Sequence, residues 1–128
     1  MITNFEEITE ELSDHEKTLI PILVKCFQKY TVSNPITGGE VVRKMNAFKP
    51  EYKMSEPRLR KCVNYIRKQA IIPLIATSQG YFVSYDRAII QSQIKSLHER
   101  AGAILSCSTG LSRFINQDKN MVINTPHH

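Results

Sequence analysis

The sequence predicts a mostly helical α+β fold with three helices, a small β-hairpin and one further long helix. Two S/T-x-x-E capping boxes, Ser13 to Glu16 and Thr37 to Glu40, mark the starts of the first two helices. In such a box the N-cap hydroxyl accepts from the third helical amide, while the glutamate side chain reaches back. After residue 70 the helical spacing of apolar residues changes to a short β-branched run. We therefore predict helices over residues 13–30, 38–46 and 55–70.

The apolar residues of the first two helices keep helical spacing and indicate a common core. Pro21 lies inside the first helix and removes one backbone hydrogen bond, so a kink is expected near residues 17–21. Ile36 and Val41 have the spacing of a hydrophobic staple at the start of the second helix. The predicted core includes Leu23, Phe27, Val41, Met45, Leu59, Val63, Ile66 and Ile75.

The third helix is expected to be strongly amphipathic. Ser55 is a suitable N-cap, and Pro57 is tolerated in the first turn. One arc holds the apolar residues Leu59, Cys62, Val63, Ile66 and Ala70. The opposite face holds Lys61, Asn64, Tyr65 and Lys68, with Arg58, Arg60 and Arg67 on its flanks. Because Glu56 is the one acidic residue of this helix, its outer face is cationic.

Two short strands, LIAT and GYFV, are predicted around a turn at Ser78-Gln79. Gly80 supplies the permissive backbone that such a turn favours. Pro73 precedes the first strand, where its missing N–H does no harm. The expected order is therefore helix, helix, helix, hairpin.

Charge is unevenly distributed along the 128 residues, whose net charge is +5. Residues 1–20 carry six acidic side chains against one lysine, which is −5. Residues 43–68 carry nine Lys or Arg against two glutamates, which is +7. One segment therefore produces most of the positive field. Such a charge run is more often a solvated helix face, and the alternative is a surface that binds an anionic partner.

The segment RLRKCVNYIRKQAIIPLIATSQGYFV resembles the recognition helix and wing of the winged helix-turn-helix domain in biotin-repressor-type regulators. The matching residues are Arg58, Val63, Ile66, Ile72 or Ile75, and Gly80-Tyr81. The chain is also similar to small winged-helix proteins of phages and prophages, in which a long helix follows the wing. Two departures are Ala70, where the pattern has glycine, and residues 47–54, which exceed a compact turn. We expect no biotin ligase domain in 128 residues, so the activity of that domain is not implied.

The resemblance implies a protein that binds double-stranded DNA, as a transcriptional regulator or as a replication or recombination accessory factor. Arg58 and Lys61 are candidates for guanine and Asn64 for adenine. The predicted DNA-binding residues are Arg43, Lys44, Lys53, Ser55, Arg58, Lys61, Asn64, Tyr65 and Lys68. Basic side chains on the second helix and the following loop would hold phosphates. The alternative is a protein-interaction module whose basic face binds an acidic partner.

Other functions find little support in the sequence. No triad, metal-ligand or phosphate-loop spacing is present, and Cys107 is far in sequence from His98 and His15, so we expect no enzyme, cofactor or small-molecule ligand. Cys26, Cys62 and Cys107 are predicted to be buried free thiols in a reducing cytoplasm. No apolar run approaches the roughly 20 residues that span a bilayer.

The last predicted helix covers residues 86–109, with Asp86 as N-cap and Gly110 as the residue that ends it. Its apolar residues follow the a/d rhythm of a coiled coil, namely Ile90, Ile94, Leu97, Ala101 and Ile104. We predict a homodimer through this helix; the alternative is packing on the chain's own core. Residues 1–12 are expected to be flexible or partly helical, and residues 110–128 weakly ordered. His127-His128 could be a remnant of a purification tag.

Overall fold

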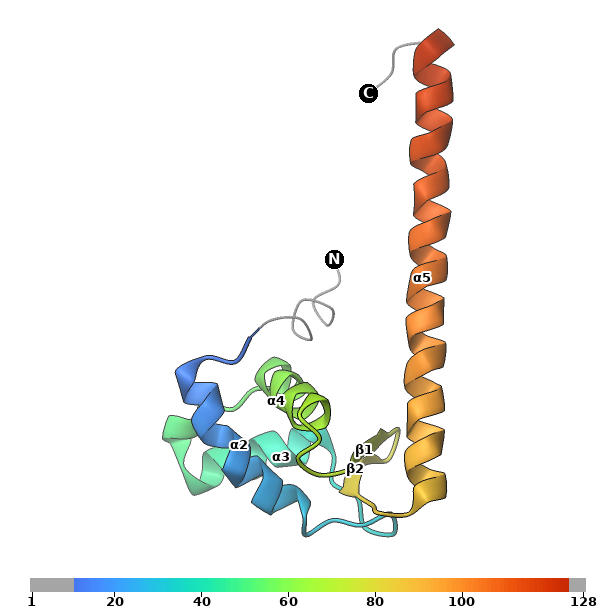
Figure 1. Ribbon diagram of the computed structural model, residues 1–128. Helices are drawn as coiled ribbons and strands as arrows, with labels where there is room; N and C mark the ends of the chain where they lie inside the picture. The colour runs from blue at the N-terminus through green and yellow to red at the C-terminus, as the bar shows by residue number, and fades with distance from the viewer. Residues whose placement is uncertain (1–10, 125–128) are drawn as a thin grey trace. The chain divides into compact units, whose positions relative to one another are not determined.

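The computed structural model describes residues 11–124 and has a mostly helical α+β fold (Figure 1). The elements are α2 (Asp14–Phe27), α3 (Gly38–Phe48), η1 (Pro50–Tyr52), α4 (Glu56–Lys68), β1 (Leu74–Thr77), β2 (Gly80–Val83) and α5 (Arg87–Asn124). The two strands form one antiparallel sheet, which confirms the predicted order of elements. The chain divides at Ile90 into two units. The predictions for residues 1–10 and for His127-His128 lie outside the described residues.

Side-chain caps begin the three helices of the first unit as predicted. Ser13 and Thr37 are N-caps of complete capping boxes, in which Glu16 and Glu40 return the hydrogen bond. The Ser55 hydroxyl accepts from the Arg58 amide and caps α4. The helix ends differ from expectation by two or three residues, because α2 stops at Phe27 and α3 continues to Phe48 before Pro50 interrupts it. The helix α2 continues through Pro21, and the kink remains a prediction.

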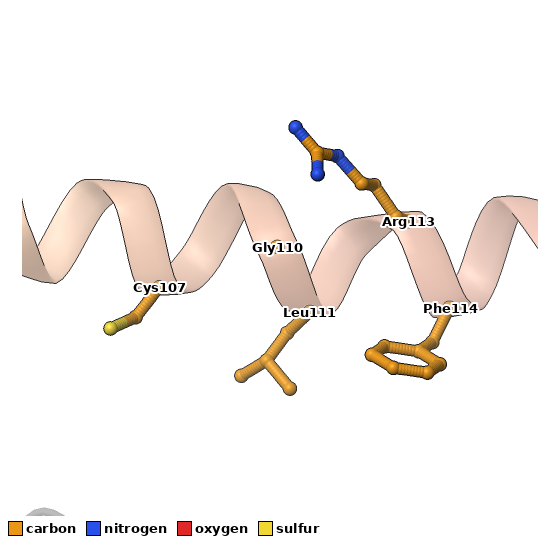
Figure 2. A pocket seen from close by; sticks show the side chains of 5 residues that line it. All are labelled: Cys107, Gly110, Leu111, Arg113 and Phe114. Carbon is orange, nitrogen blue, oxygen red and sulfur yellow. The ribbon is translucent and has the colours of Figure 1, made fainter.

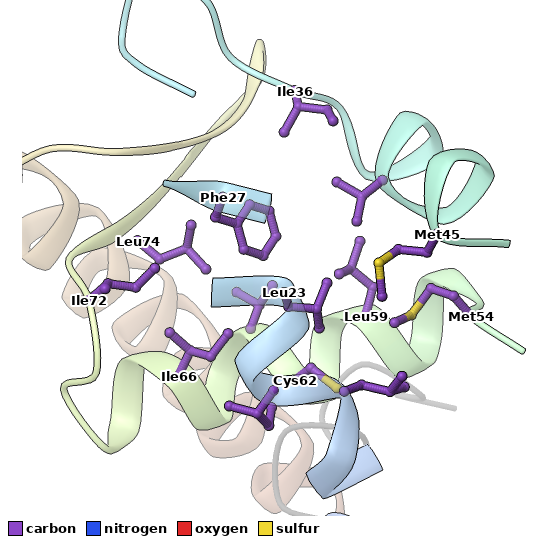
Figure 3. Close-up of a cluster of buried hydrophobic side chains, with 14 residues drawn as sticks. Leu23, Phe27, Ile36, Met45, Met54, Leu59, Cys62, Ile66, Ile72 and Leu74 are labelled. Carbon is purple, nitrogen blue, oxygen red and sulfur yellow. The ribbon is translucent and has the colours of Figure 1, made fainter. Parts of the chain in front are cut away.

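The core lies between α2, α3, α4 and the hairpin, and all eight predicted core residues are buried. Leu23 and Phe27 of α2 lie among side chains from the other elements, including Leu59 and Ile66 of α4 and Leu74 of β1 (Figure 3). The Phe27 ring also packs on the Tyr81 ring of β2, with 5.4 Å between ring centroids. The amphipathic pattern therefore predicted the packing surfaces of these helices correctly.

The hairpin is also tied to the segment that precedes α3. Ile36 and Tyr81 exchange backbone hydrogen bonds in both directions, with N···O distances of 2.9 and 2.7 Å. Tyr81 on β2 is thus flanked on one side by β1 and on the other by Ile36. The neighbouring Gly80 has a φ of +129°, and a Cβ there would lie 2.5 Å from the Ile36 carbonyl oxygen. The bridge therefore requires glycine at this position.

The connection between α3 and α4 is longer than a compact turn, but a single side chain closes it. The Asn46 amide donates to the Met54 carbonyl oxygen at 2.9 Å, and its own oxygen accepts from the Met54 amide at 2.8 Å. Between these two residues, η1 forms one short turn and Lys53 adopts a left-handed φ of 49°. Met54 is buried in the core. The loop is therefore anchored at both ends by hydrogen bonds and by packing.

Ala70 is a correction to the predicted apolar stripe, because it is exposed while the other four members are buried. The helix α4 ends at Lys68, and Ala70 adopts a left-handed φ of 54°. The Ile71 amide donates to the Ile66 carbonyl and the Ala70 amide to that of Arg67, both at 3.0 Å. This pairing is a Schellman motif, in which the left-handed residue is usually glycine. Ala70 thus ends the helix instead of extending its apolar face.

Replacing Ala70 with glycine should stabilise the first unit by roughly 0.5–1 kcal/mol. A left-handed conformation costs a residue with a Cβ about 1–2 kcal/mol, and the greater entropy of unfolded glycine offsets part of that gain. Urea denaturation followed by tyrosine fluorescence is a suitable measurement, because all five tyrosines lie between residues 30 and 85. The control Ala47→Gly, on the exposed face of α3, should destabilise by a similar amount. Destabilisation by both changes would contradict the assignment of Ala70 as the left-handed residue that ends α4.

The helix α5 is longer than predicted. Its N-cap is Asp86, as expected, since the Asp86 carboxylate accepts from the Ala88 amide at 2.9 Å. The helix does not end at Gly110, however, but continues to Asn124, so the predicted end of the helix at residue 109 is wrong. The predicted weakly ordered tail is wrong for residues 110–124, and residues 125–128 lie outside the described residues. A glycine inside a helix costs only about 1 kcal/mol, which neighbouring residues can offset. None of the helices within residues 11–124 is both long and apolar enough to cross a membrane.

Candidate nucleic-acid interface

The predicted DNA-binding residues lie in different environments. Arg43, Lys44, Lys53 and Lys68 are exposed, whereas Arg58, Lys61, Asn64 and Tyr65 are partly buried. Tyr65 packs against the hydrophobic core, and the Ser55 hydroxyl is occupied as the cap of α4. The structure therefore separates the predicted set into residues on the surface and residues held by internal contacts.

Arg58 and Lys61 form an ion cluster with Glu16 of α2, which we call the Glu16 cluster. Arg58 Nε lies 2.9 Å from Glu16 Oε2, and Lys61 Nζ lies 2.9 Å from Glu16 Oε1. The Glu16 side chain is only 4% exposed, and it also accepts from the Ser13 amide. Burial by itself would raise the pKa of Glu16, but the hydrogen bonds from Lys61, Ser13 and Arg58 lower that pKa to about 2.

The Glu16 cluster changes the roles that we assign to its two cations. Arg58 also donates to the Lys53 carbonyl oxygen at 2.8 Å, so its guanidinium joins α2, the preceding loop and α4. The Lys61 side chain is 13% exposed. Both groups hold α4 against α2, and withdrawing either would leave a buried carboxylate without part of its compensation. These contacts make Arg58 and Lys61 structural residues.

The opposite side of α4, toward the hairpin, carries two arginines that were predicted only as flanking residues. Arg67 Nε donates to the Leu74 carbonyl oxygen of β1 at 3.0 Å. Burial raises the pKa of Tyr81 on β2, while the charges of Arg67 and Arg60 partly oppose that rise. Both arginines therefore act electrostatically on the Tyr81 hydroxyl. At about 100° per residue, Asn64 and Lys68 fall between this side and the side of the Glu16 cluster.

The basic residues of α3 lie near more than one neighbouring element. Burial raises the pKa of the Cys26 thiol on α2, and the charges of Lys29 and Lys44 partly counter this effect. The charge of Lys44 therefore acts on the C-terminal part of α2. Arg43, one position earlier on α3, lies about 100° away from Lys44 around the helix axis.

The turn of the hairpin is uncharged. Thr77 and Gly80 pair across it, which confirms the predicted two-residue loop of Ser78 and Gln79. The Thr77 hydroxyl accepts from the Gln79 amide at 3.1 Å. Any contact that this turn makes with a phosphate would therefore come from neutral polar groups.

The predicted dimerisation residues lie along α5. Ile90 is partly buried, and Ile94, Leu97, Ala101 and Ile104 are exposed. The exposed fractions of Ile94, Leu97 and Ile104 are 47%, 37% and 51%. Continuation of the helix past Gly110 adds Leu111 and Ile115 at the same heptad spacing, with exposed fractions of 67% and 60%.

The remaining chemically reactive side chains do not converge. His15 Nε2 donates to the Tyr52 carbonyl oxygen at 2.7 Å, and His98 is exposed on α5. In the part of the chain that the structure describes, no group of three His, Cys, Asp or Glu residues could hold a metal ion. The three cysteines are free thiols, but the prediction that all are buried is wrong, because Cys107 is exposed and Cys26 is partly so.

None of the protein-family models, curated proteins and solved structures compared with the chain matches it. The residues and their geometry are therefore the basis for a functional assignment.

Proposed function

We propose that residues 13–85 form a winged helix-turn-helix domain that binds double-stranded DNA through the outer face of α4. Three helices followed by a hairpin have the order of that fold, and the bridge between Ile36 and Tyr81 supplies the short third pairing beside the wing. The observation that carries the proposal is the charge of α4, whose outer surface combines basic residues with one acid, Glu56, at the helix N-terminus. Such a helix suits the negative potential of a DNA groove.

Within this proposal the DNA-reading face, defined as Arg60, Asn64 and Lys68, replaces the face centred on Arg58 and Lys61. Asn64 has the amide that can bond to adenine, and Arg60 the guanidinium that can bond to guanine. Lys68 is exposed at the end of α4 and suits a phosphate contact. Exposed Arg43 and Lys53 would contact the DNA backbone from α3 and the loop before α4.

Replacing Lys68 with alanine should weaken duplex binding. The slope of log K against the logarithm of the salt concentration should become shallower by about one. Asn64→Ala should instead cost about 1–3 kcal/mol at one base pair of a selected target. Fluorescence anisotropy with a labelled duplex, selected from random sequence and titrated at several salt concentrations, measures both effects.

The control for charge alone is Lys25→Ala. Lys25 is exposed on α2, opposite the buried stripe of that helix. Its replacement should leave the affinity for the duplex nearly unchanged. Equal losses from Lys25→Ala and Lys68→Ala would indicate non-specific attraction. Absence of duplex binding at low salt, with capture of an acidic protein instead, would favour the interaction-module alternative.

We also propose that two copies pair through α5, which would place two α4 helices on a symmetric DNA site. The support is the run of exposed apolar residues at heptad spacing between Ile90 and Ile115. We place this activity in a reducing cytoplasm, a compartment that suits the free cysteines. Whether the role is in transcription, replication or recombination depends on the target sequence that selection recovers.

A further inference from the structure

A second heptad seam runs along the C-terminal half of α5. The first seam, through Ile104, Ser108, Leu111 and Ile115, occupies the a and d positions of the heptad. The second consists of Ala103, Cys107, Gly110 and Phe114, whose spacings of four, three and four place them at the c and g positions. At 3.5 residues per turn the two seams lie about 100° apart around the helix.

The second seam has the shape as well as the spacing of a helix-packing surface. A hollow opens at Gly110, lined by Cys107, Leu111, Arg113 and Phe114 (Figure 2). Cys107, Leu111 and Phe114 point to the same side of the helix, and Arg113 points away from them. Positions 107, 110, 111 and 114 have the i, i+3, i+4, i+7 arrangement that forms a hole for a knob from a neighbouring helix. A Cβ at Gly110 would meet no other atom within 4 Å, so none of the described side chains of α5 fills the hollow.

The charge pattern favours another copy of this chain as the occupant. Residues 101–112 carry no charged side chain, and Arg100 and Arg113 bound this stretch. Identical segments can therefore meet without repulsion, whereas a charged partner would find no countercharge. The flank opposite the second seam carries His98, Leu105 and Ser112. Leu105 is the one large apolar residue among these three, so this flank has no continuous apolar seam.

We infer that α5 joins four copies of the chain, as a pair of dimers. The first seam pairs two helices, and the second seam of each helix, left exposed by that pairing, contacts a helix of another pair. In a two-stranded coiled coil, residues at c and g positions stay largely in water. Phe114 is a large apolar residue at such a g position and is 64% exposed. Large exposed apolar surfaces mark contacts with another molecule. Two different self-complementary seams, at an angle near the roughly 90° corner of four helices, close as a tetramer with two-fold axes.

This inference rests on the proposed pairing of two copies through α5. Replacing glycine with arginine at each of two positions tests the second seam separately from that pairing. Gly110→Arg fills the hollow with a charged side chain and increases helix propensity, so it does not break α5. Gly102→Arg is the matched control, because position 102 is a b position about 130° from both seams. Sedimentation equilibrium of the full chain, from about one to several hundred micromolar, gives the mass of each, and circular dichroism checks that helix content is retained.

We expect a tetramer for the wild type and for Gly102→Arg, and a twofold lower mass for Gly110→Arg. The dimer formed by Gly110→Arg should keep its affinity for a duplex with two half-sites. A wild type that remains a dimer at the highest concentration, or a Gly110→Arg variant that remains a tetramer, would overturn the second seam and leave the pairing intact. A monomeric wild type would overturn the pairing as well, without bearing on the DNA-reading face.

Discussion

Replacing Glu16 with glutamine should lower the free energy of unfolding of the first unit by about 3 kcal/mol at neutral pH. Glutamine also serves at the third position of a capping box, so the cap on α2 is retained. The substitution removes the negative charge that compensates Arg58 and Lys61, and breaking a buried pair on one side is strongly destabilising. The magnitude agrees with the fall in the Glu16 pKa from 4.5 to about 2.

The same lowered pKa predicts how stability varies with pH. The folded protein holds Glu16 ionised down to about pH 2, whereas the unfolded chain protonates it near its ordinary value of 4.5. The stabilisation is therefore complete above about pH 5 and is lost as the pH falls from 4.5 toward 2. Wild type and Glu16→Gln should converge in stability over that interval, which urea denaturation at a series of pH values measures.

Glu40→Gln is the matched control. Glu40 occupies the same position in the capping box of α3, but its carboxylate bonds to Thr37 at the surface of the molecule. Its loss of charge should change the unfolding midpoint far less than the loss at Glu16. If both variants unfold at the same urea concentration, Glu16 acts through its cap and the contribution of the ion pairs is small.

Gly80→Ala should destabilise the first unit by at least about 3 kcal/mol. The new methyl group would lie 2.5 Å from the oxygen and 2.7 Å from the carbon of the Ile36 carbonyl, which is backbone and cannot rotate away. A φ of +129° is in addition a conformation that residues with a Cβ rarely adopt. The bridge between Ile36 and Tyr81 must therefore open, and the packing of Tyr81 on Phe27 is lost with it.

Gly39→Ala is the corresponding control. A Cβ at position 39 would meet no atom within 4 Å, and Gly39 lies in the first turn of α3. Alanine there should be neutral or should stabilise by about 0.5–1 kcal/mol. Tyrosine fluorescence during urea denaturation reports both variants. An unfolding free energy for Gly80→Ala within about 0.5 kcal/mol of wild type would show that the bridge contributes little to stability.

Local signals in the sequence were sufficient to predict most of the first unit. The capping boxes at Ser13 and Thr37 involve contacts three residues apart, and the period of apolar residues reports which face of a helix is buried. Both kinds of information lie within a few turns of one helix. For that reason the elements and the buried residues of α2, α3, α4 and the hairpin were predicted closely.

The candidate site was harder to predict, because its electrostatics depend on contacts between distant residues. Glu16 is 42 positions from Arg58, and nothing in its local sequence indicated that its side chain would be buried. Arg60 and Arg67 were placed on the flanks of α4, and only the fold shows that their charges act on Tyr81 and that Arg67 bonds to β1. A helical wheel separates polar from apolar faces but does not tell which polar side a neighbouring helix will cover.

The errors at Gly110 and Ala70 also have physical causes. Glycine often ends a helix, but only when the residues after it do not favour helix. The helix α5 continues past Gly110. Ala70 fits the apolar arc of α4 by its angle, yet the chain turns there into the left-handed conformation that a glycine would normally adopt. In both positions the conformation depends on the next few residues of the chain as much as on the residue itself.

The Asn46 clamp has a consequence for how the protein can vary among relatives. Asn46 both donates to and accepts from Met54, and aspartate could only accept, while serine is too short to reach both groups. Ala47, Phe48, Lys49 and Pro50 between them are exposed. The exposed residues 47–50 are thus free to change in sequence while Asn46 persists. Relatives of this chain should be recognisable by this asparagine and by a buried apolar residue eight positions later, because the two hydrogen bonds involve only the backbone of Met54.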